Sequence, residues 1–243
     1  MIILNLNIMN SIKNFFKLII PNQLLVYRRS MILDAQRKKF HKGCKEFLIL
    51  VDSLLKRNNL EYWINYGTLL GAYRDHNFII HDYDIDIGMF FSDRYKVLKL
   101  FQENGIKLYI EVNFKDWNNP ICSEYRFEYK GAFMDINFYE KINEEAIESY
   151  DFTLFDNVDY SKSNVILPCK TEKISNKFLG LSEIDFLGQK FPVPANTEEY
   201  IISCYGPNYR IPVKDFDYHD VATNYEIVDD NETLGYFQKY EIH

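Results

Sequence analysis

Three aspartates spaced two residues apart constrain this chain more than any other feature of its sequence. Asp82, Asp84 and Asp86 alternate with aromatic and aliphatic residues in the stretch DYDIDI. Because successive side chains of a β-strand point to opposite faces, this period of two predicts a strand with all three carboxylates on one face. Apolar residues flank the stretch at 78–80 and 89–91. We therefore expect a buried strand over residues 79–90, and the alternative is an acid-rich strand that faces solvent.

Carboxylates that share one face of a buried strand need a compensating positive charge. Two of them about 5 Å apart repel each other by about 3 kcal/mol at an effective dielectric constant of about 20. A hard divalent cation, Mg²⁺ or Mn²⁺, relieves that repulsion and prefers oxygen ligands. An EF-hand loop also begins with this alternation, but Ile87 and Asp93 stand where such a loop needs Gly and Glu. The aspartates therefore predict a metal site on a strand.

A turn just upstream is suited to bind phosphate. The sequence predicts a strand over Tyr62–Tyr66, then Gly67 and Thr68, then a short helix over 68–74. Such a junction presents free backbone N–H groups and the positive end of a helix dipole. Gly67 permits close approach of a ligand, Thr68 is expected to cap the helix, and Arg74 can fork onto a phosphate. Together with the acidic strand, the turn predicts a site for phosphate and metal.

A further acid lies in a later strand. Asp135 falls in the stretch AFMDINFY, for which we predict a strand over 132–139. Aspartate is disfavoured within strands, so its presence needs a reason. We expect it beside Asp84 and Asp86 on a neighbouring strand, as a third metal ligand or as the base that accepts a proton from a hydroxyl. The alternative is a structural aspartate bonded to a loop.

The remaining pattern indicates one domain that mixes helices and strands. Apolar residues at three- and four-residue steps predict a helix over 34–58, and Ser92 is expected to cap a second helix that ends near Asn104. Strands are expected over 106–113 and 122–130, and a last helix over 196–205. Prolines and glycines make 140–195 look irregular. The economical fold class is α/β or α+β.

Charge is distributed unevenly along the chain. Residues 1–45 hold nine basic side chains and one acidic one, so they carry +8 and leave −15 for the rest of a chain whose net charge is −7. Because the chain after residue 45 is this acidic, it should repel a nucleic-acid backbone, and we expect no nucleic-acid partner. The basic end could meet an anionic membrane or an acidic substrate, but the charge pattern favours a solvated helix face.

The first thirty residues read as an amphipathic segment that precedes a single domain over 31–243. Apolar side chains at 12, 15, 16, 19 and 20 can form one face of a helix that ends at Pro21. With the basic residues nearby, this segment resembles an interfacial membrane anchor, and the alternative is a helix packed on the domain. Lys13 and Lys17 follow the apolar start, whereas a signal peptide has its positive charges first. No window approaches eighteen unbroken apolar residues, so we expect no transmembrane helix.

The four cysteines show neither a CxxC pair nor a histidine at zinc spacing. We interpret them as free thiols in a reducing compartment. The expected location is therefore cytoplasmic, with peripheral membrane contact through residues 1–30. Asp217, His219 and Asp220 form a weaker second group of candidate metal ligands.

The motifs at 67–86 resemble a known signature. The stretch GTLLGAYR at 67–74, followed by DYDID at 82–86, looks like the signature of the LicD/fukutin family, which belongs to the nucleotidyltransferase-fold superfamily. Met134-Asp135-Ile136 is similar to the family's third-acid strand, and residues 191–209 look like its C-terminal portion. The resemblance implies a nucleotidyltransferase-like mixed sheet flanked by helices.

The resemblance also implies an activity: metal-dependent transfer of a phosphoalcohol, such as phosphocholine or ribitol phosphate, from a CDP-linked donor to a glycan hydroxyl. Residue by residue, it makes Asp84 and Asp86 metal ligands for Mg²⁺ or Mn²⁺ and Asp135 the third acid. Gly67, Thr68 and Arg74 would hold donor phosphate, and Asp82 would support the strand or bind the metal through water. Two alternatives stay open: transfer of a nucleoside monophosphate to a small-molecule or protein hydroxyl, and an inactive nucleotide- or glycan-binding module.

Overall fold

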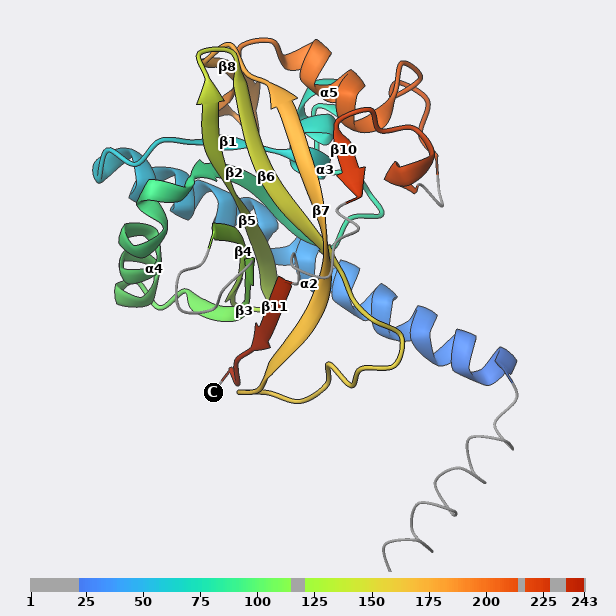
Figure 1. The fold of residues 1–243 in the computed structure, drawn as a ribbon. Helices are drawn as coiled ribbons and strands as arrows, with labels where there is room; N and C mark the ends of the chain where they lie inside the picture. The colour runs from blue at the N-terminus through green and yellow to red at the C-terminus, as the bar shows by residue number, and fades with distance from the viewer. Residues whose placement is uncertain (1–21, 115–120, 214–216, 228–234, 243) are drawn as a thin grey trace, which may run out of the picture. The chain divides into compact units, whose positions relative to one another are not determined.

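The computed structural model describes residues 22–114, 121–213, 217–227 and 235–242 (Figure 1). The chain divides into two compact units, residues 1–39 and residues 40–243. The described part of the first unit, residues 22–39, is helical and forms the start of α2 (Asn22–Arg57). The amphipathic helix expected before Pro21 lies outside the described residues. In the described part of the chain, no helix is long and apolar enough to cross a bilayer.

The second unit is built on a large mixed sheet. Its strand order among the described residues is β1-β2-β5-β4-β3-β11-β7-β10, and β6 joins β5 to β7. The bounds of these strands are β1 Tyr62–Ile64, β2 Asp84–Phe90, β3 Lys107–Phe114, β4 Ile121–Tyr129, β5 Ala132–Asn143, β6 Ala146–Thr153, β7 Ile166–Lys177, β10 Tyr225–Ile227 and β11 Gly235–Lys239. A separate hairpin consists of β8 (Leu181–Phe186) and β9 (Gln189–Pro194).

Helical segments accompany the sheet in this unit. They are the C-terminal half of α2, α3 (Tyr66–Leu70), a π-helical turn Gly71–Asp75, 3-10 turns at Phe91–Asp93 and Tyr218–Asp220, α4 (Arg94–Glu103) and α5 (Thr197–Tyr205). The mixture of a large sheet with helices confirms the predicted α/β (α+β) class.

Six strands of this sheet pair in a closed ring, in the order β5-β6-β7-β11-β3-β4 and back to β5. The first part of β5 pairs with β2 and β4, and its second part pairs with β6. β6 runs beside β7, β7 pairs with β11, and β11 pairs with β3 (Figure 1). Because β3 pairs with β4, the ladder returns to β5. Among these pairs only β2 and β5 are parallel, and it is these two strands that carry the acids of the predicted site.

One hydrophobic core supports that pair of strands. The buried face of α2 supplies Phe40, Phe47 and Val51, as its periodicity predicted, and the sheet supplies Trp63 and Ile85 among others. Residues at alternate positions of β2 point into this core, whereas Asp84 and Asp86 stay partly exposed. The period of two therefore separates an apolar face from an acidic face, as expected from the sequence.

The prediction for residues 140–195 was wrong, because most of this stretch lies in strands β5 to β9. Leu187 and Gly188 both have positive φ, 54° and 90°, so they form the tight turn that joins β8 to β9. Pro192 and Pro194 lie in β9, which pairs only with β8 among the described strands. Proline is tolerated there because an edge strand has N–H groups that need no partner.

Candidate functional site

Three predicted acids lie on two neighbouring strands. In the parallel ladder, Asp86 of β2 is directly opposite Asp135 of β5, and Asp84 is opposite Phe133. The side chains of Asp84 and Asp135 are 18% and 8% exposed, so both are largely removed from water. Asp82 was expected on the same strand, but β2 begins only at Asp84. That part of the strand prediction, residues 79–83, was wrong.

Asp82 nevertheless lies near Asp86, because both carboxylates lie close to Gly67. A Cβ atom built on Gly67 would lie 2.9 Å from Oδ2 of Asp82 and 3.2 Å from Oδ2 of Asp86. Any residue other than glycine at position 67 would therefore displace a carboxylate, whether or not a ligand is bound. Gly67 lies within α3, directly after Tyr66, whose φ of 34° is a left-handed conformation that non-glycine residues rarely adopt.

Thr68 fixes this turn to the acidic strand. Its side chain is 1% exposed, and its Oγ1 accepts a hydrogen bond of 2.9 Å from the backbone N–H of Asp86. The predicted capping role was wrong, since α3 begins two residues earlier and Asn65 occupies its N-cap position. The backbone N–H of Asn65 donates to the carbonyl of Asp86 at 2.9 Å. Two hydrogen bonds thus hold the turn in register with the carboxylates.

A buried network of hydrogen-bonded hydroxyl groups stabilises the residues just before Gly67. Asn65 donates through Nδ2 to the hydroxyl of Tyr139 (3.0 Å) and accepts through Oδ1 from the hydroxyl of Tyr200 (3.0 Å). Tyr139 in turn donates to the hydroxyl of Tyr66 (3.1 Å). Burial, the largest cause, raises the pKa of Tyr139 to about 12. These groups remain neutral and link α5, which carries Tyr200, to the strained residue before Gly67.

Arg126 of β4 occupies the centre of the acidic face. It lies directly opposite Asp135 in the ladder between β4 and β5. Its Nε donates to Oδ1 of Asp135 (2.6 Å), and its Nη2 donates to Oδ2 of Asp135 and to Oδ2 of Asp84 (2.9 Å). Arg126 therefore binds Asp135 in a bidentate fork and bridges it to Asp84.

Even with Arg126 present, the site is short of positive charge. Burial raises the pKa of Asp84 to about 7; the charge of Asp135 adds to this effect and Arg126 opposes it. Burial also raises the pKa of Asp86 well above its ordinary value, and the neighbouring aspartates raise it further. The pKa of Glu124, on β4 opposite Asn137, is raised well above its ordinary value for the same two reasons. Such shifts indicate a site that attracts cations or protons.

Arg74 lies at the end of the turn that follows Gly67. Its guanidinium donates to both carboxylate oxygens of Asp75, at 2.8 and 2.7 Å, and to the carbonyl of Tyr209 at 3.1 Å. The charge of Asp82 is close enough to contribute to its raised pKa, although the hydrogen bond with Asp75 is the largest cause. Its predicted contact with phosphate stays a prediction.

The acids fit a hard divalent cation in their chemistry. All candidate donors are carboxylate oxygens, and Oδ1 of Asp84 lies outside the hydrogen bonds made by Arg126. The carboxylate of Asp86 has no ion pair or hydrogen bond with the described residues. In the described part of the chain, no three Asp, Glu, His or Cys side chains converge closely enough to enclose a metal ion as they stand. Asp84 and Asp86 are thus the residues most open to a cation, and Asp135 is held by Arg126.

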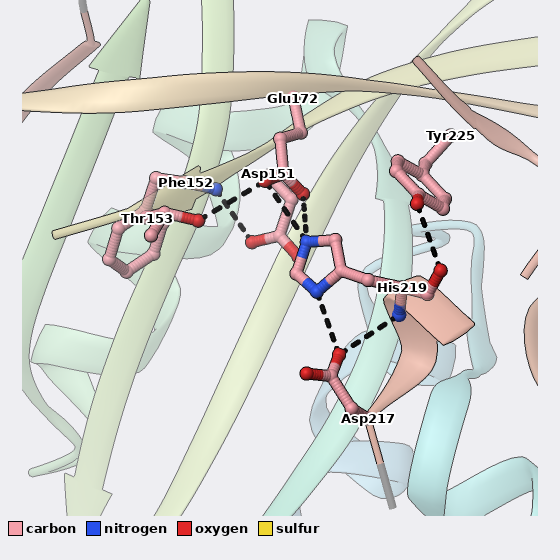
Figure 2. Close-up of polar contacts among 7 residues, drawn as sticks. All are labelled: Asp151, Phe152, Thr153, Glu172, Asp217, His219 and Tyr225. Carbon is pink, nitrogen blue, oxygen red and sulfur yellow. Dashed lines mark hydrogen bonds and ion pairs between the residues drawn. The ribbon is translucent and has the colours of Figure 1, made fainter. Parts of the chain in front are cut away.

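A second polar cluster surrounds His219 (Figure 2). Its Nε2 lies 3.0 and 3.1 Å from the two carboxylate oxygens of Glu172, and its Nδ1 lies 2.8 Å from Oδ1 of Asp217. Burial alone would lower the pKa of His219, but the hydrogen bonds and charges of Glu172 and Asp217 raise it overall. Asp151, opposite Glu172 in the ladder, has its pKa raised to about 6, first by burial. The weak expectation of metal ligands here gains no support, since the imidazole is already bonded at both nitrogens.

Sequence reasoning missed Arg126 and Glu124, although a signal was present. Glu124, Arg126 and Glu128 occupy every second position of the predicted strand 122–130, with aromatic residues between them. This is the same alternation that identified the aspartates. Applied to this strand, it places Glu124 and Arg126 on one face, toward the acids.

Known proteins are similar to this chain in sequence. A family model described as "LicD/FKTN/FKRP, nucleotidyltransferase domain" matches residues 59–196. The human protein named ribitol-5-phosphate transferase FKTN is 28% identical over 183 residues, 74% of this chain and 36% of that protein. Its mouse counterpart is 27% identical over 189 residues, 76% of this chain and 37% of that protein.

A bacterial relative also matches. An uncharacterized protein of Rickettsia typhi is 29% identical over 161 residues, 62% of this chain and 47% of that protein. This chain therefore spans between about a third and a half of the length of these relatives. The matched model covers more than half of the chain and includes the Gly67 turn, all four aspartates and Arg126. The chain belongs to the LicD/FKTN/FKRP nucleotidyltransferase-domain family.

Proposed function

We propose that this protein transfers a phosphoalcohol, of the phosphocholine or ribitol-phosphate kind, from a CDP-linked donor to a hydroxyl of a cell-surface glycan. The observation that carries the proposal is the parallel pair of β2 and β5, which places Asp84, Asp86 and Asp135 side by side next to a glycine turn. Family membership and the printed name of the human and mouse relatives favour this transfer over other reactions of the same site.

In the proposed reaction, the acceptor hydroxyl attacks the phosphorus that carries the alcohol. A new P–O bond forms, the bond to the CMP phosphate breaks, and CMP leaves. Asp84 and Asp86 would hold Mg²⁺ or Mn²⁺, which supplies positive charge to the donor phosphates. Gly67, Thr68 and Arg74 would position the donor, with Asp82 as an additional ligand through water. Asp135, the third acid, would complete the ligand set or accept the hydroxyl proton.

The proposal places the protein in the cytoplasm with peripheral membrane contact. Cys44, Cys169 and Cys204 are buried and free, which suits a reducing compartment. The basic residues of the N-terminal segment would attract an anionic membrane surface, where a lipid-linked glycan would be presented.

A product assay tests the reaction. Purified protein would be incubated with CDP-choline, CDP-ribitol, CDP-glycerol or nucleoside triphosphates, each with and without Mg²⁺ and with glycan acceptors. We expect Mg²⁺-dependent release of CMP, and we expect its loss in Asp84→Asn. Asp185→Asn is the matched control, because the Asp185 side chain is 85% exposed on β8.

Other results would point elsewhere. Release of pyrophosphate from a nucleoside triphosphate would replace the proposal with nucleotidyl transfer. Failure to bind any nucleotide in calorimetry would favour a glycan-binding module without catalytic activity. Near-normal turnover by Asp84→Asn would refute the metal-ligand assignment.

A further inference from the structure

Two donor groups of Arg126 find no acceptor in the part of the chain that the structure describes. A guanidinium carries five N–H groups in a fixed plane. Those of Nε and Nη2 are committed to Asp135 and Asp84. The two on Nη1 have no acceptor among the described residues. Nη1 is not one of the buried side-chain atoms without a hydrogen bond, so it keeps contact with solvent, and the Arg126 side chain as a whole is 26% exposed. One end of the guanidinium is therefore fixed and the other is open.

The fixed end holds the open end in a defined place. Asp135, which is 8% exposed, accepts hydrogen bonds from Nε and Nη2 of Arg126. Asp84, which is 18% exposed, accepts a third hydrogen bond from Nη2. An arginine bound in this way has already lost its rotamer freedom, so a further ligand gains binding energy without paying that entropy again. A simple salt bridge would not need the guanidinium to be held by three hydrogen bonds in one orientation.

The location of the open end is also informative. Arg126, Asp135 and Asp86 lie opposite one another in register across β4, β5 and β2. The open Nη1 group is thus on the same face as the carboxylates open to a cation. Arg126, Asp84, Asp135 and Asp86 together carry a formal charge of −2, so an anion can approach this face only together with a cation.

We propose that Nη1 of Arg126 binds a phosphate oxygen of the CDP-linked donor, while Asp135 and Asp84 hold the guanidinium in position. Arg126 is then a substrate-binding residue, and Asp135 acts at least partly as a positioning residue for it. This inference rests on the proposed function, because it assumes that a nucleotide diphosphate enters the site with a divalent cation. A guanidinium suits this task because its donors match phosphate oxygens.

Calorimetry on Arg126→Lys tests the proposal without turnover. Lysine keeps the charge but not the planar fork. With Mg²⁺ present, we expect the affinity for CDP and CMP to fall about 10- to 100-fold. Binding of Mn²⁺ alone, followed by electron paramagnetic resonance, should change by no more than about twofold. Arg210→Lys is the matched control, since Arg210 is 63% exposed and pairs with Glu198; it should bind CDP as the wild type does.

A second comparison covers the case in which Arg126→Lys does not fold. Asp135→Asn alone would be compared with the double variant Arg126→Gln/Asp135→Asn, in which one charge of each sign is removed. Nucleotide affinity should fall further, again about tenfold or more, when Arg126 is lost in the Asp135→Asn background.

The outcomes separate this inference from the proposed function. Wild-type protein that binds CDP with Mg²⁺ together with an Arg126→Lys variant that binds it equally well would overturn the role of Arg126 and leave the function intact. An equal loss of Mn²⁺ and nucleotide binding would make Arg126 a purely structural residue. Wild-type protein that binds no cytidine nucleotide would overturn the proposed function and this inference with it.

Discussion

Asp86 is the carboxylate of the site that receives least support from the protein. Its backbone N–H and C=O groups are bonded to Thr68 and Asn65, so its position is fixed. Burial, in contrast, raises the pKa of its carboxylate, and the charges of Asp84, Asp135 and Asp82 raise this pKa further. A fixed carboxylate that has no partner among the described residues is costly to the folded protein and useful to a cation.

Replacing Asp86 with Asn should therefore separate stability from function. Without metal, Asp86→Asn should unfold at a higher temperature than the wild type, because burial and the neighbouring aspartates make ionisation of Asp86 costly in the folded protein. We expect a gain of about 1 kcal/mol, the usual size of a stabilising substitution. Addition of Mg²⁺ should stabilise the wild type and leave the variant unchanged. Thermal unfolding with and without Mg²⁺ measures both effects. Asp185→Asn serves as the exposed control, and an equal response of Asp86→Asn to Mg²⁺ would exclude Asp86 as a ligand.

His219 should make stability depend on pH. Its folded-state pKa is raised above the ordinary value of 6.5 by Glu172 and Asp217, against the effect of burial. A raised histidine pKa contributes stability that is complete below the unfolded-state pKa and is lost as the pH rises through the folded-state pKa. The unfolding free energy of the wild type should exceed that of His219→Gln most below pH 6.5, and the difference should shrink as the pH rises through the folded-state pKa of His219.

The expected size of this effect is modest. The His219 side chain is 36% exposed, so solvent screening limits the difference to about 1 kcal/mol or less. Urea unfolding at several pH values measures it. His76→Asn is the matched control, because His76 is exposed and its φ of 51° suits asparagine. A difference that grows with pH would contradict the assignment of His219 as a cation between two carboxylates.

At the scale of elements, helix α5 supports the site although it contributes none of the acids. Tyr200 of α5 is 1% exposed, and its hydroxyl lies at hydrogen-bonding distance from Asn65 and from Tyr139 (3.0 and 3.3 Å). Asn65 is the N-cap residue of α3, the short helix that contains Gly67 and Thr68. The position of the turn thus depends on a residue of α5 that lies 135 positions later in the chain than Asn65.

Tyr200→Phe should test that dependence. Removal of the hydroxyl leaves Oδ1 of Asn65 buried without a donor, which costs about 1–3 kcal/mol. We also expect weaker binding of Mg²⁺ and CDP, because the turn beside the acids loses its support. Urea unfolding and calorimetry provide the two measurements. Tyr95→Phe removes a hydroxyl from a side chain in a residue that is 60% exposed, and it should change neither quantity.

The contrast between predicted and observed elements has a physical basis. The helix over 34–58 and the strand around Asp84 have strong periodic patterns, and the structure contains both within α2 and β2. In β6 and β7, by contrast, polar and charged residues such as Ser149, Thr171 and Glu172 are buried. A strand whose inner face is partly polar lacks the apolar alternation on which prediction depends. Pairing with distant strands decides its structure, and no local signal reports that pairing.

The same distinction applies to the site. The alternation of aspartates predicted that Asp84 and Asp86 share a face, and the register between β2 and β5 places Asp135 beside them. Clamping of Asp135 by Arg126 depends instead on the pairing of β4 with β5. The hydroxyl network depends on where α5 packs. Sequence spacing identifies groups on one element, whereas contacts between elements require the fold.

At the scale of the whole molecule, the charge asymmetry coincides with the division into units. The first unit, residues 1–39, includes seven of the nine basic side chains of the N-terminal segment. Within its described part, Lys38 and Lys39 are exposed and Arg37 pairs with Asp34 at 3.2 Å. Met31 is 56% exposed. Cationic and apolar groups on one helical segment are the combination that binds an anionic lipid surface.

Membrane binding should therefore follow lipid charge and residues 1–30. Full-length protein should sediment with vesicles that contain phosphatidylserine and not with phosphatidylcholine vesicles, and salt should weaken the binding. Removal of residues 1–30 should abolish it. The full-length variant Lys38→Glu/Lys39→Glu should weaken binding about tenfold or more, because each basic residue near the surface contributes about 1 kcal/mol and the variant adds repulsion. Lys96→Glu/Lys99→Glu, two exposed lysines of α4, is the matched control. Equal sedimentation of all variants, or binding to neutral vesicles, would show that the basic segment is a solvated helix face rather than a membrane contact.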